Sequence, residues 1–194
     1  MAPPALAFQD RYTYSDYSQW DDGERWELIE GIAYNMTPAP NRRHQELLSA
    51  LFLLIGPGIK GKNCHIYTAP FDVRLPQVGE SADETDTVVQ PDLSVFCGKD
   101  RLDDKGATGA PDWVIEILSP STAKKDMTVK TMLYQKHGVN EYWLVDPEKE
   151  EITVNLLGST TLQYDIPSIF ERKDSITQSG FPDLVVELEG VFGE

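Results

Sequence analysis

The spacing of apolar residues along the chain changes several times, and each change marks an expected element. Apolar residues in 42–55 recur at three- and four-residue steps, which predicts a helix ending at Gly56-Pro57-Gly58. A short helix is expected over 13–20, capped by Thr13 or Ser15, and another over 122–137, closed by Gly138. Residues 26–36 hold two short apolar runs around Glu30-Gly31, which predicts a β-hairpin.

Short runs rich in β-branched and aromatic residues predict the remaining strands. These are residues 65–69, 71–75, 88–96 (interrupted by Pro91), 113–118 and 141–145, with a trailing hairpin over 152–157 and 161–164. The polar stretches 76–87 and 99–111 have no period and are expected to be loops. Helices and strands in this order predict an α/β (α+β) fold, a mixed central sheet flanked by helices.

Length and charge restrict the classes that fit. The 194 residues suit one domain over 1–194, with residues 1–10 as a loose arm. A net charge of -15 works against nonspecific affinity for nucleic acid or anionic membrane. No signal peptide or apolar run long enough to span a membrane is present, so a cytoplasmic location is expected. Cys64 and Cys97 form no CxxC pattern and are expected to be two small buried residues.

Two carboxylates stand out against their apolar neighbours. Glu116 interrupts the run 113–118, and a carboxylate in a buried strand is costly unless it is paired or binds a metal. Asp92 follows Pro91, which marks a bulge or an edge beside the next strand. An edge strand with Glu116 facing solvent, and a plain turn aspartate at 92, are the alternatives. Converging strand carboxylates would make an oxygen-rich site suited to Mg²⁺ or Mn²⁺.

The helix after Glu116 offers a possible third element. Asp126, Lys130 and Tyr134 follow at four-residue steps and share one helical face. They form either a solvated ion pair or a group that brings Lys130 to the metal site, with Lys124 and Lys125 as weaker candidates. His44 and Glu46, near the start of the helix at 42, could join the site or simply lie at an exposed helix start.

The sequence does not favour a zinc site, a phosphate-binding loop or a nucleophile elbow. The three histidines are scattered without zinc-binding spacing. No phosphate-binding glycine motif and no nucleophile elbow occurs.

Taken together, these motifs resemble the Uma2-type restriction endonuclease family of the PD-(D/E)XK nuclease superfamily, across about residues 20–190. The resemblance rests on Pro91-Asp92, the run 113–122, Asp126 with Lys130 and Tyr134, the run 138–147, Glu27-Leu28-Ile29-Glu30-Gly31, and Pro38-Ala39-Pro40 before His44. It implies a restriction-endonuclease-like core in which Asp92 and Glu116 bind Mg²⁺ (or Mn²⁺) to hydrolyse DNA. The superfamily pattern places lysine two positions after the second acid, where this chain has Leu118. The resemblance therefore implies that the lysine has moved to Lys130.

Three functions remain open at this point. The first is a metal-dependent endodeoxyribonuclease with Asp92, Glu116 and Lys130 as catalytic residues and Glu46, His44, Asp126 and Tyr134 as candidate accessory residues. The second is an inactive nuclease-fold protein with a binding or scaffold role, which the acidic charge favours. The third is a metal-dependent hydrolase of another phosphate ester. A local positive cleft is expected if Arg42 and Arg43 converge with Lys124, Lys125 and Lys130.

A homodimer is expected from the resemblance, since restriction-type enzymes often cut two strands with two sites. The aromatic residues Tyr12, Tyr14, Tyr17 and Trp20 could form its interface or could cover the protein's own core.

Overall fold

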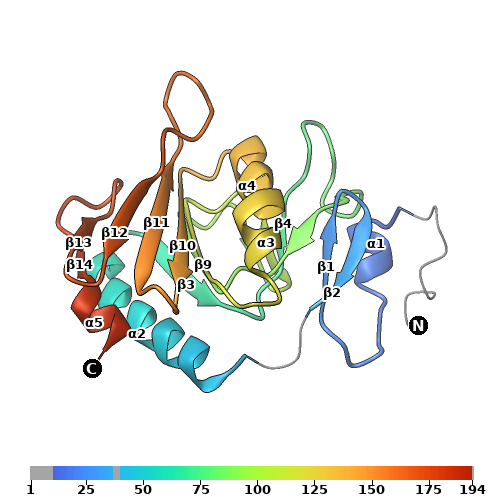
Figure 1. Ribbon diagram of the computed structural model, residues 1–194. Coiled ribbons are helices and arrows are strands. Elements are labelled where there is room, and N and C mark those ends of the chain that lie inside the picture. The colour runs from blue at the N-terminus through green and yellow to red at the C-terminus, as the bar shows by residue number, and fades with distance from the viewer. Residues whose placement is uncertain (1–10, 37–39, 194) are drawn as a thin grey trace.

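A six-stranded mixed sheet forms the centre of the computed structural model, which describes residues 11–36 and 40–193 (Figure 1). The strand order is β12-β11-β10-β9-β6-β3. The strands are β3 (Cys64–Thr68), β6 (Leu93–Cys97), β9 (Trp113–Ile117), β10 (Glu141–Asp146), β11 (Glu151–Leu156) and β12 (Ser168–Glu171). In this sheet β9 and β10 pair in parallel, and the other neighbouring strands pair antiparallel. The predicted mixed central sheet is confirmed.

Helices cover both faces of this sheet (Figure 1). The helix α2 (Arg42–Ile59) packs Leu47, Leu51 and Ile55 into the same core as Trp113, Ile115 and Ile117 of β9. The opposite face is covered by α3 (Ala123–Lys125), a π-helical turn η1 (Asp126–Lys130) and α4 (Thr131–His137). Because side chains alternate along a strand, Glu116 of β9 lies on this second face.

A second sheet lies toward the N-terminal side, with order β2-β1-β5-β4-β8-β7. Its strands are β1 (Trp26–Ile29), β2 (Ile32–Asn35), β4 (Val73–Arg74), β5 (Val88–Val89), β7 (Leu102–Asp103) and β8 (Gly106–Thr108). The predicted hairpin is confirmed: β1 pairs with β2, and Glu30 and Gly31 between them both have positive φ, as a tight hairpin turn requires.

The N-terminal aromatic residues cover the protein's own core. The predicted short helix is α1 (Tyr14–Tyr17), capped by Thr13. Tyr14 is buried with Leu28 and Val88, and Tyr12, Tyr17 and Trp20 pack against this small cluster while remaining half-buried. At the C-terminal side, β13 (Ser175–Thr177) pairs with β14 (Val185–Glu187), and α5 (Leu188–Phe192) packs beside α2 (Figure 1).

The prediction of one strand over 88–96 is wrong. Val88 and Val89 belong to the N-terminal sheet, whereas β6 begins at Leu93 in the central sheet. Pro91 has no N–H to donate to a ladder, so it suits the short crossing between the sheets. Asp92 therefore lies where the two sheets meet.

The helix predicted to end at Gly56-Pro57-Gly58 instead continues to Ile59. Gly58 marks a close contact rather than a helix end, because a Cβ there would lie 2.5 Å from Leu184 Cδ1 and the leucine side chain would have to move. Pro57 stands in the last turn of the helix, where few residues follow it.

Two further predictions fail in detail. The stretch 99–111 is not wholly a loop, since it contains β7 and β8. Residues 161–164 form no strand, and their pairing with the preceding strand is a single bridge between Leu157 and Tyr164. On the side away from β10, β11 pairs with β12, which lies later in the chain. In both cases the pairing is decided by contacts outside the local sequence.

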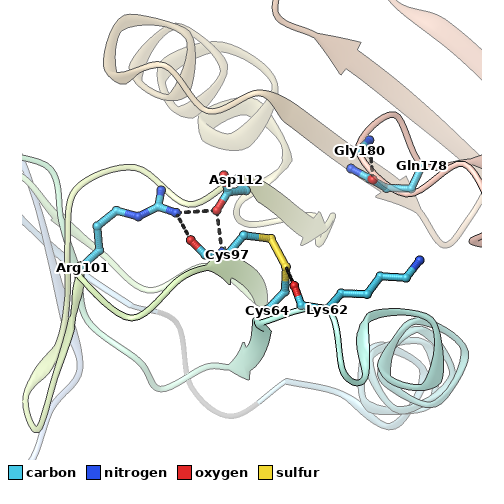
Figure 2. The surroundings of a disulfide bond; sticks show 7 residues. All are labelled: Lys62, Cys64, Cys97, Arg101, Asp112, Gln178 and Gly180. Carbon is cyan, nitrogen blue, oxygen red and sulfur yellow. Dashed lines mark hydrogen bonds and ion pairs between the residues drawn. A yellow bond between two sulfur atoms is a disulfide. The ribbon is translucent and has the colours of Figure 1, made fainter.

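The cysteines are not separate buried residues but a disulfide, Cys64–Cys97, which closes a sequence separation of 33 (Figure 2). The antiparallel register of β3 and β6 sets Cys64 opposite Cys97, with their Cα atoms 4.0 Å apart. Asp112 accepts from Cys97 N–H and pairs with Arg101 beside the bond (Figure 2). Disulfides are uncommon in the reducing cytosol, so this bond counts against the expected cytoplasmic location.

Within residues 11–36 and 40–193, no helix is both long and apolar enough to cross a membrane.

Candidate active site

Asp92 and Glu116 are held together by the strands that carry them. Asp92 directly precedes β6, and Glu116 lies in the neighbouring strand β9. The Asp92 N–H donates to Glu116 Oε2 at 3.3 Å, and the Ile117 N–H donates to Asp92 Oδ2 at 2.8 Å. These reciprocal bonds fix both carboxylates at the junction of the two sheets, so the predicted pair does converge.

Lys130 reaches the same place from the helical face. Its Nζ lies 2.8 Å from Glu116 Oε1 and 2.8 Å from Glu27 Oε1, and 3.8 Å from Asp126 Oδ1. Tyr134 Oη donates to Glu116 Oε1 at 2.9 Å. Lys130 is 3% exposed, and Asp126 and Tyr134 are also buried, so the alternative of a solvated ion pair is wrong.

A π-helical turn places this group. The five residues of η1 interrupt the helix between α3 and α4, and both Asp126 and Lys130 belong to it. The Asp126 carbonyl accepts from Thr131 Oγ1 at 3.0 Å and from Tyr142 Oη at 3.1 Å, so two side chains anchor the start of this turn. Single π-turns inside α-helices are frequent at functional sites.

Glu27 belongs to this site, although the sequence pattern alone assigned it no role. It is fully buried in β1 and accepts from Lys125 Nζ at 2.7 Å and from Gln90 N–H at 3.2 Å, besides its ion pair with Lys130. The signal that could have found it is the same as for Glu116, a carboxylate alone in an apolar run, here residues 26–29. Three acidic side chains, from β1, β9 and η1, therefore surround Lys130.

The pKa shifts follow from this burial and crowding. Burial raises the pKa of Glu116 to about 8, and the nearby carboxylates of Asp126, Asp92 and Glu27 raise it as well. Lys130 lowers this pKa, but not enough to offset them. Burial would also raise the pKa of Glu27, but Lys130 and Lys125 outweigh it and lower that pKa to about 2. Burial lowers the pKa of Lys130, yet Glu116, Glu27 and Asp126 outweigh it and hold Lys130 protonated. The cluster thus combines a firmly ionised glutamate with one that readily holds a proton.

Of the two accessory candidates near the start of α2, one lies in the site. His44 Nε2 lies 3.1 Å from Asp92 Oδ2, and Asn41 caps the helix by accepting from His44 N–H at 2.9 Å. The imidazole is buried, and its Nδ1 has no hydrogen-bond partner within the described residues. Glu46 lies outside the lining of the cleft described below and pairs with Arg42 one turn away.

These residues line a cleft of about 620 Å³. It includes Glu27, His44, Asp92, Glu116, Asp126 and Lys130. The expected positive cleft forms only in part, since Arg43 and Lys125 line it but Arg42 and Lys124 do not. Arg43 pairs with Glu150, and Lys125 pairs with Glu27, so carboxylates offset both cations.

The donor set fits one hard divalent ion that keeps part of its water shell. Oε1 of Glu116 is occupied by Lys130 and Tyr134, and Oδ2 of Asp92 by Ile117 and His44. Asp92 Oδ1 and the remaining lone pair of Glu116 Oε2 are left for a cation. Among the described residues no group of three or more His, Cys, Asp or Glu could hold a metal. Mg²⁺ is commonly bound through one or two carboxylates with retained waters, and Mn²⁺ also prefers oxygen ligands.

The residues of this site lie within the part of the chain that matches a known family. The family model of Uma2, described as "Putative restriction endonuclease", matches residues 14–189. The chain belongs to the Uma2 family. An uncharacterized protein of Synechocystis sp. is 28% identical over 141 residues, covering 71% of this chain and 70% of that protein.

A solved structure shares the fold of this Uma2 chain. It is described as a putative nuclease belonging to DUF820 from Anabaena variabilis, with a TM-score of 0.73 and 22% identity over 93% of this chain and 97% of that one. At this identity the likeness supports the nuclease-like fold and nothing finer. The Uma2 family model supports a nuclease at this coarse level.

Proposed function

We propose that this Uma2 protein is a metal-dependent endodeoxyribonuclease that hydrolyses phosphodiester bonds of DNA. The observation that carries the proposal is the convergence of Asp92, Glu116 and Lys130 in one cleft. Asp92 directly precedes β6, Glu116 lies in β9, and Lys130 reaches the acidic pair from the helical segment that follows β9.

In this proposal, the carboxylates of Asp92 and Glu116 would hold Mg²⁺ or Mn²⁺. When bound, such an ion activates water and stabilises charge on a phosphoryl group. Lys130 and Tyr134 fix Glu116 Oε1, and His44 and the Ile117 N–H fix Asp92 Oδ2. These contacts orient the remaining oxygens of both acids toward the cleft.

Lys130 has a further electrostatic role. Its positive charge partly neutralises Glu27, Glu116 and Asp126. This reduces the repulsion that a phosphate group would meet in the cleft. DNA binding to a chain of net charge -15 would then rely on few phosphate contacts, and its affinity would depend only modestly on salt.

The test is cleavage of supercoiled, linear and single-stranded DNA with Mg²⁺, with Mn²⁺ and with a chelator. The variants are Asp92→Asn and Glu116→Gln, which keep side-chain size, with Glu189→Gln at an exposed position of α5 as a matched control. Cleavage should require the metal, fall at least about 100-fold in both site variants and persist in the control. Absence of cleavage by the wild type with every metal, or full activity of Asp92→Asn, would contradict the proposal.

Calorimetric titration with Mn²⁺ separates the alternatives. A nuclease or another phosphate-ester hydrolase should bind Mn²⁺ and lose that binding in Glu116→Gln. Binding without hydrolysis of DNA or of a simple aryl phosphate diester would point to the scaffold role instead. The homodimer and the cytoplasmic location stay predictions, and sedimentation at several concentrations tests the first.

A further inference from the structure

A second hollow of about 440 Å³ adjoins the proposed active site. Its walls include the aromatic residues Tyr17, Trp20 and Trp26 from the N-terminal part and the polar residues Arg25, Asp72 and Gln90. Arg25 and Gln90 also line the cleft that holds Asp92 and Glu116, so the two hollows share a wall. The Gln90 N–H donates to Glu27 Oε1, and Gln90 lies two positions before Asp92.

The aromatic rings of this hollow are arranged edge to face. Ring centroids of Tyr17 and Trp20 are 5.5 Å apart at 60°, and those of Trp20 and Trp26 are 5.8 Å apart at 76°. All three side chains are half-buried, unlike Trp113 and Trp143, which are buried in the core. Proteins that bind single strands stack unpaired bases on aromatic side chains, and rings that keep part of their surface exposed can serve this purpose.

The polar side chains of the hollow are fixed by one another, and two atoms remain available. Arg25 donates Nε and Nη2 to Gln90 Oε1 at 3.0 and 2.6 Å. Asp72 Oδ1 accepts from Tyr17 Oη at 2.9 Å and Gln90 Nε2 at 2.8 Å. In the described part of the chain, neither Arg25 Nη1 nor Asp72 Oδ2 makes a side-chain hydrogen bond. One donor and one acceptor at a rigid wall can read the Watson–Crick edge of an unpaired nucleobase, since that edge carries both kinds of group in every base.

We propose that this hollow is a nucleobase subsite and that the preferred substrate is single-stranded DNA, with one unpaired base held beside the cleft that takes the phosphate. This inference rests on the proposed nuclease function and adds its substrate class. Base stacking also explains how a protein with a net charge of -15 could bind DNA. An acidic protein gains little from neutralising many phosphates, whereas base stacking contributes to binding without basic residues. Lys105 and Glu24 also line the hollow and carry opposite charges.

The experiment measures binding of a fluorescently labelled DNA dodecamer of mixed sequence, single-stranded and as a duplex, by anisotropy in a chelating buffer that prevents metal-dependent cleavage. The variants are Trp20→Ala, which removes a stacking surface, and Ser18→Trp, which fills the hollow from an exposed lining position without removing core packing. Phe52→Ala is the matched control, because Phe52 is a partly exposed aromatic residue of α2 that lines neither hollow. Thermal unfolding of each variant checks that it is folded.

The wild type should bind the single strand more tightly than the duplex. Trp20→Ala and Ser18→Trp should each weaken single-strand binding at least about fivefold, with Phe52→Ala unchanged. Equal binding by the wild type and Ser18→Trp, tighter binding of the duplex, or no binding of either form would overturn the subsite. A failure of the nuclease proposal alone would give a different result. The wild type would bind the single strand, Trp20→Ala and Ser18→Trp would weaken that binding, and no metal-dependent cleavage would be seen.

Discussion

Lys130 Nζ lies 2.8 Å from Glu116 Oε1 inside the protein, although the two residues are 14 positions apart and belong to a helix and a strand. Both side chains are almost completely buried, at 3% and 4% exposure. A lysine two positions after the acid would have reached the site from the strand, but Leu118 stands there. The π-helical turn supplies the ammonium group from the facing helix instead.

Replacing Lys130 with Met should abolish most DNA cleavage and destabilise the metal-free protein. The variant leaves Glu27, Glu116 and Asp126 buried without the cation that they share. Removing one partner of a buried ion pair typically costs about 3–5 kcal/mol of unfolding free energy. Denaturant unfolding with and without Mn²⁺ measures this, and Mn²⁺ should stabilise the variant more than the wild type. Lys99→Met, at an exposed position outside the cleft, provides the control. Equal stability of Lys130→Met and wild type would mean that Lys130 does not offset these acids.

Much of the site could be predicted because a buried charge is conspicuous in sequence. Glu116 interrupts an apolar run, and Asp126, Lys130 and Tyr134 follow at helical spacing, so the sequence alone predicts that they group together. It does not predict their burial, since that depends on which face of the helix packs against β9. Glu27 gives the same signal as Glu116, but its partners lie far along the chain, and pairing at that distance has no local pattern.

The errors in the fold have a similar cause. Val88 to Phe96 looks like one strand because apolar residues lie close on both sides of Pro91, yet Gln90 and Pro91 carry the chain from one sheet to the other. The disulfide depends on the register between β3 and β6, which two isolated cysteines do not reveal. The π-helical turn likewise has no sequence signature, because the residues that form it also suit an α-helix.

Tyr134→Phe should weaken Mn²⁺ binding while leaving the fold intact. The substitution removes only the hydroxyl that donates to Glu116 Oε1 at 2.9 Å. A hydrogen bond to a charged group contributes about 1.5–3 kcal/mol, so we expect roughly a tenfold loss of affinity or more by calorimetry. Tyr164→Phe is a matched control, because Tyr164 Oη donates to the Val139 carbonyl and not to the site. If both variants bind Mn²⁺ like the wild type, Tyr134 does not orient Glu116 for the metal.

Metal binding should release protons and strengthen as the pH rises toward 8. Burial, with the nearby carboxylates, raises the pKa of Glu116 to about 8, so below that pH the metal-free protein holds a proton there. A cation needs the carboxylate form, and the proton must leave. Affinity for Mn²⁺ should therefore increase up to about tenfold per pH unit between about 6 and 8 and then level off. Titrations at one pH in buffers of different ionisation enthalpy count the protons. Affinity that does not change over this range would show that Glu116 is already ionised.

The double substitution Cys64→Ser with Cys97→Ser should lower the free energy of unfolding without removing the metal site. The bond closes a sequence separation of 33, and cross-links of this kind typically stabilise a protein by about 2–4 kcal/mol, chiefly by restricting the unfolded chain. Neither cysteine lines the cleft of Asp92 and Glu116, so Mn²⁺ affinity should stay within about twofold of the wild type. A reducing agent should reproduce the loss of stability in the wild type and have no effect on the double variant. If β3 instead needs the bond to stay paired with β6, the variant would also lose Mn²⁺ binding, because β6 leads directly from Asp92.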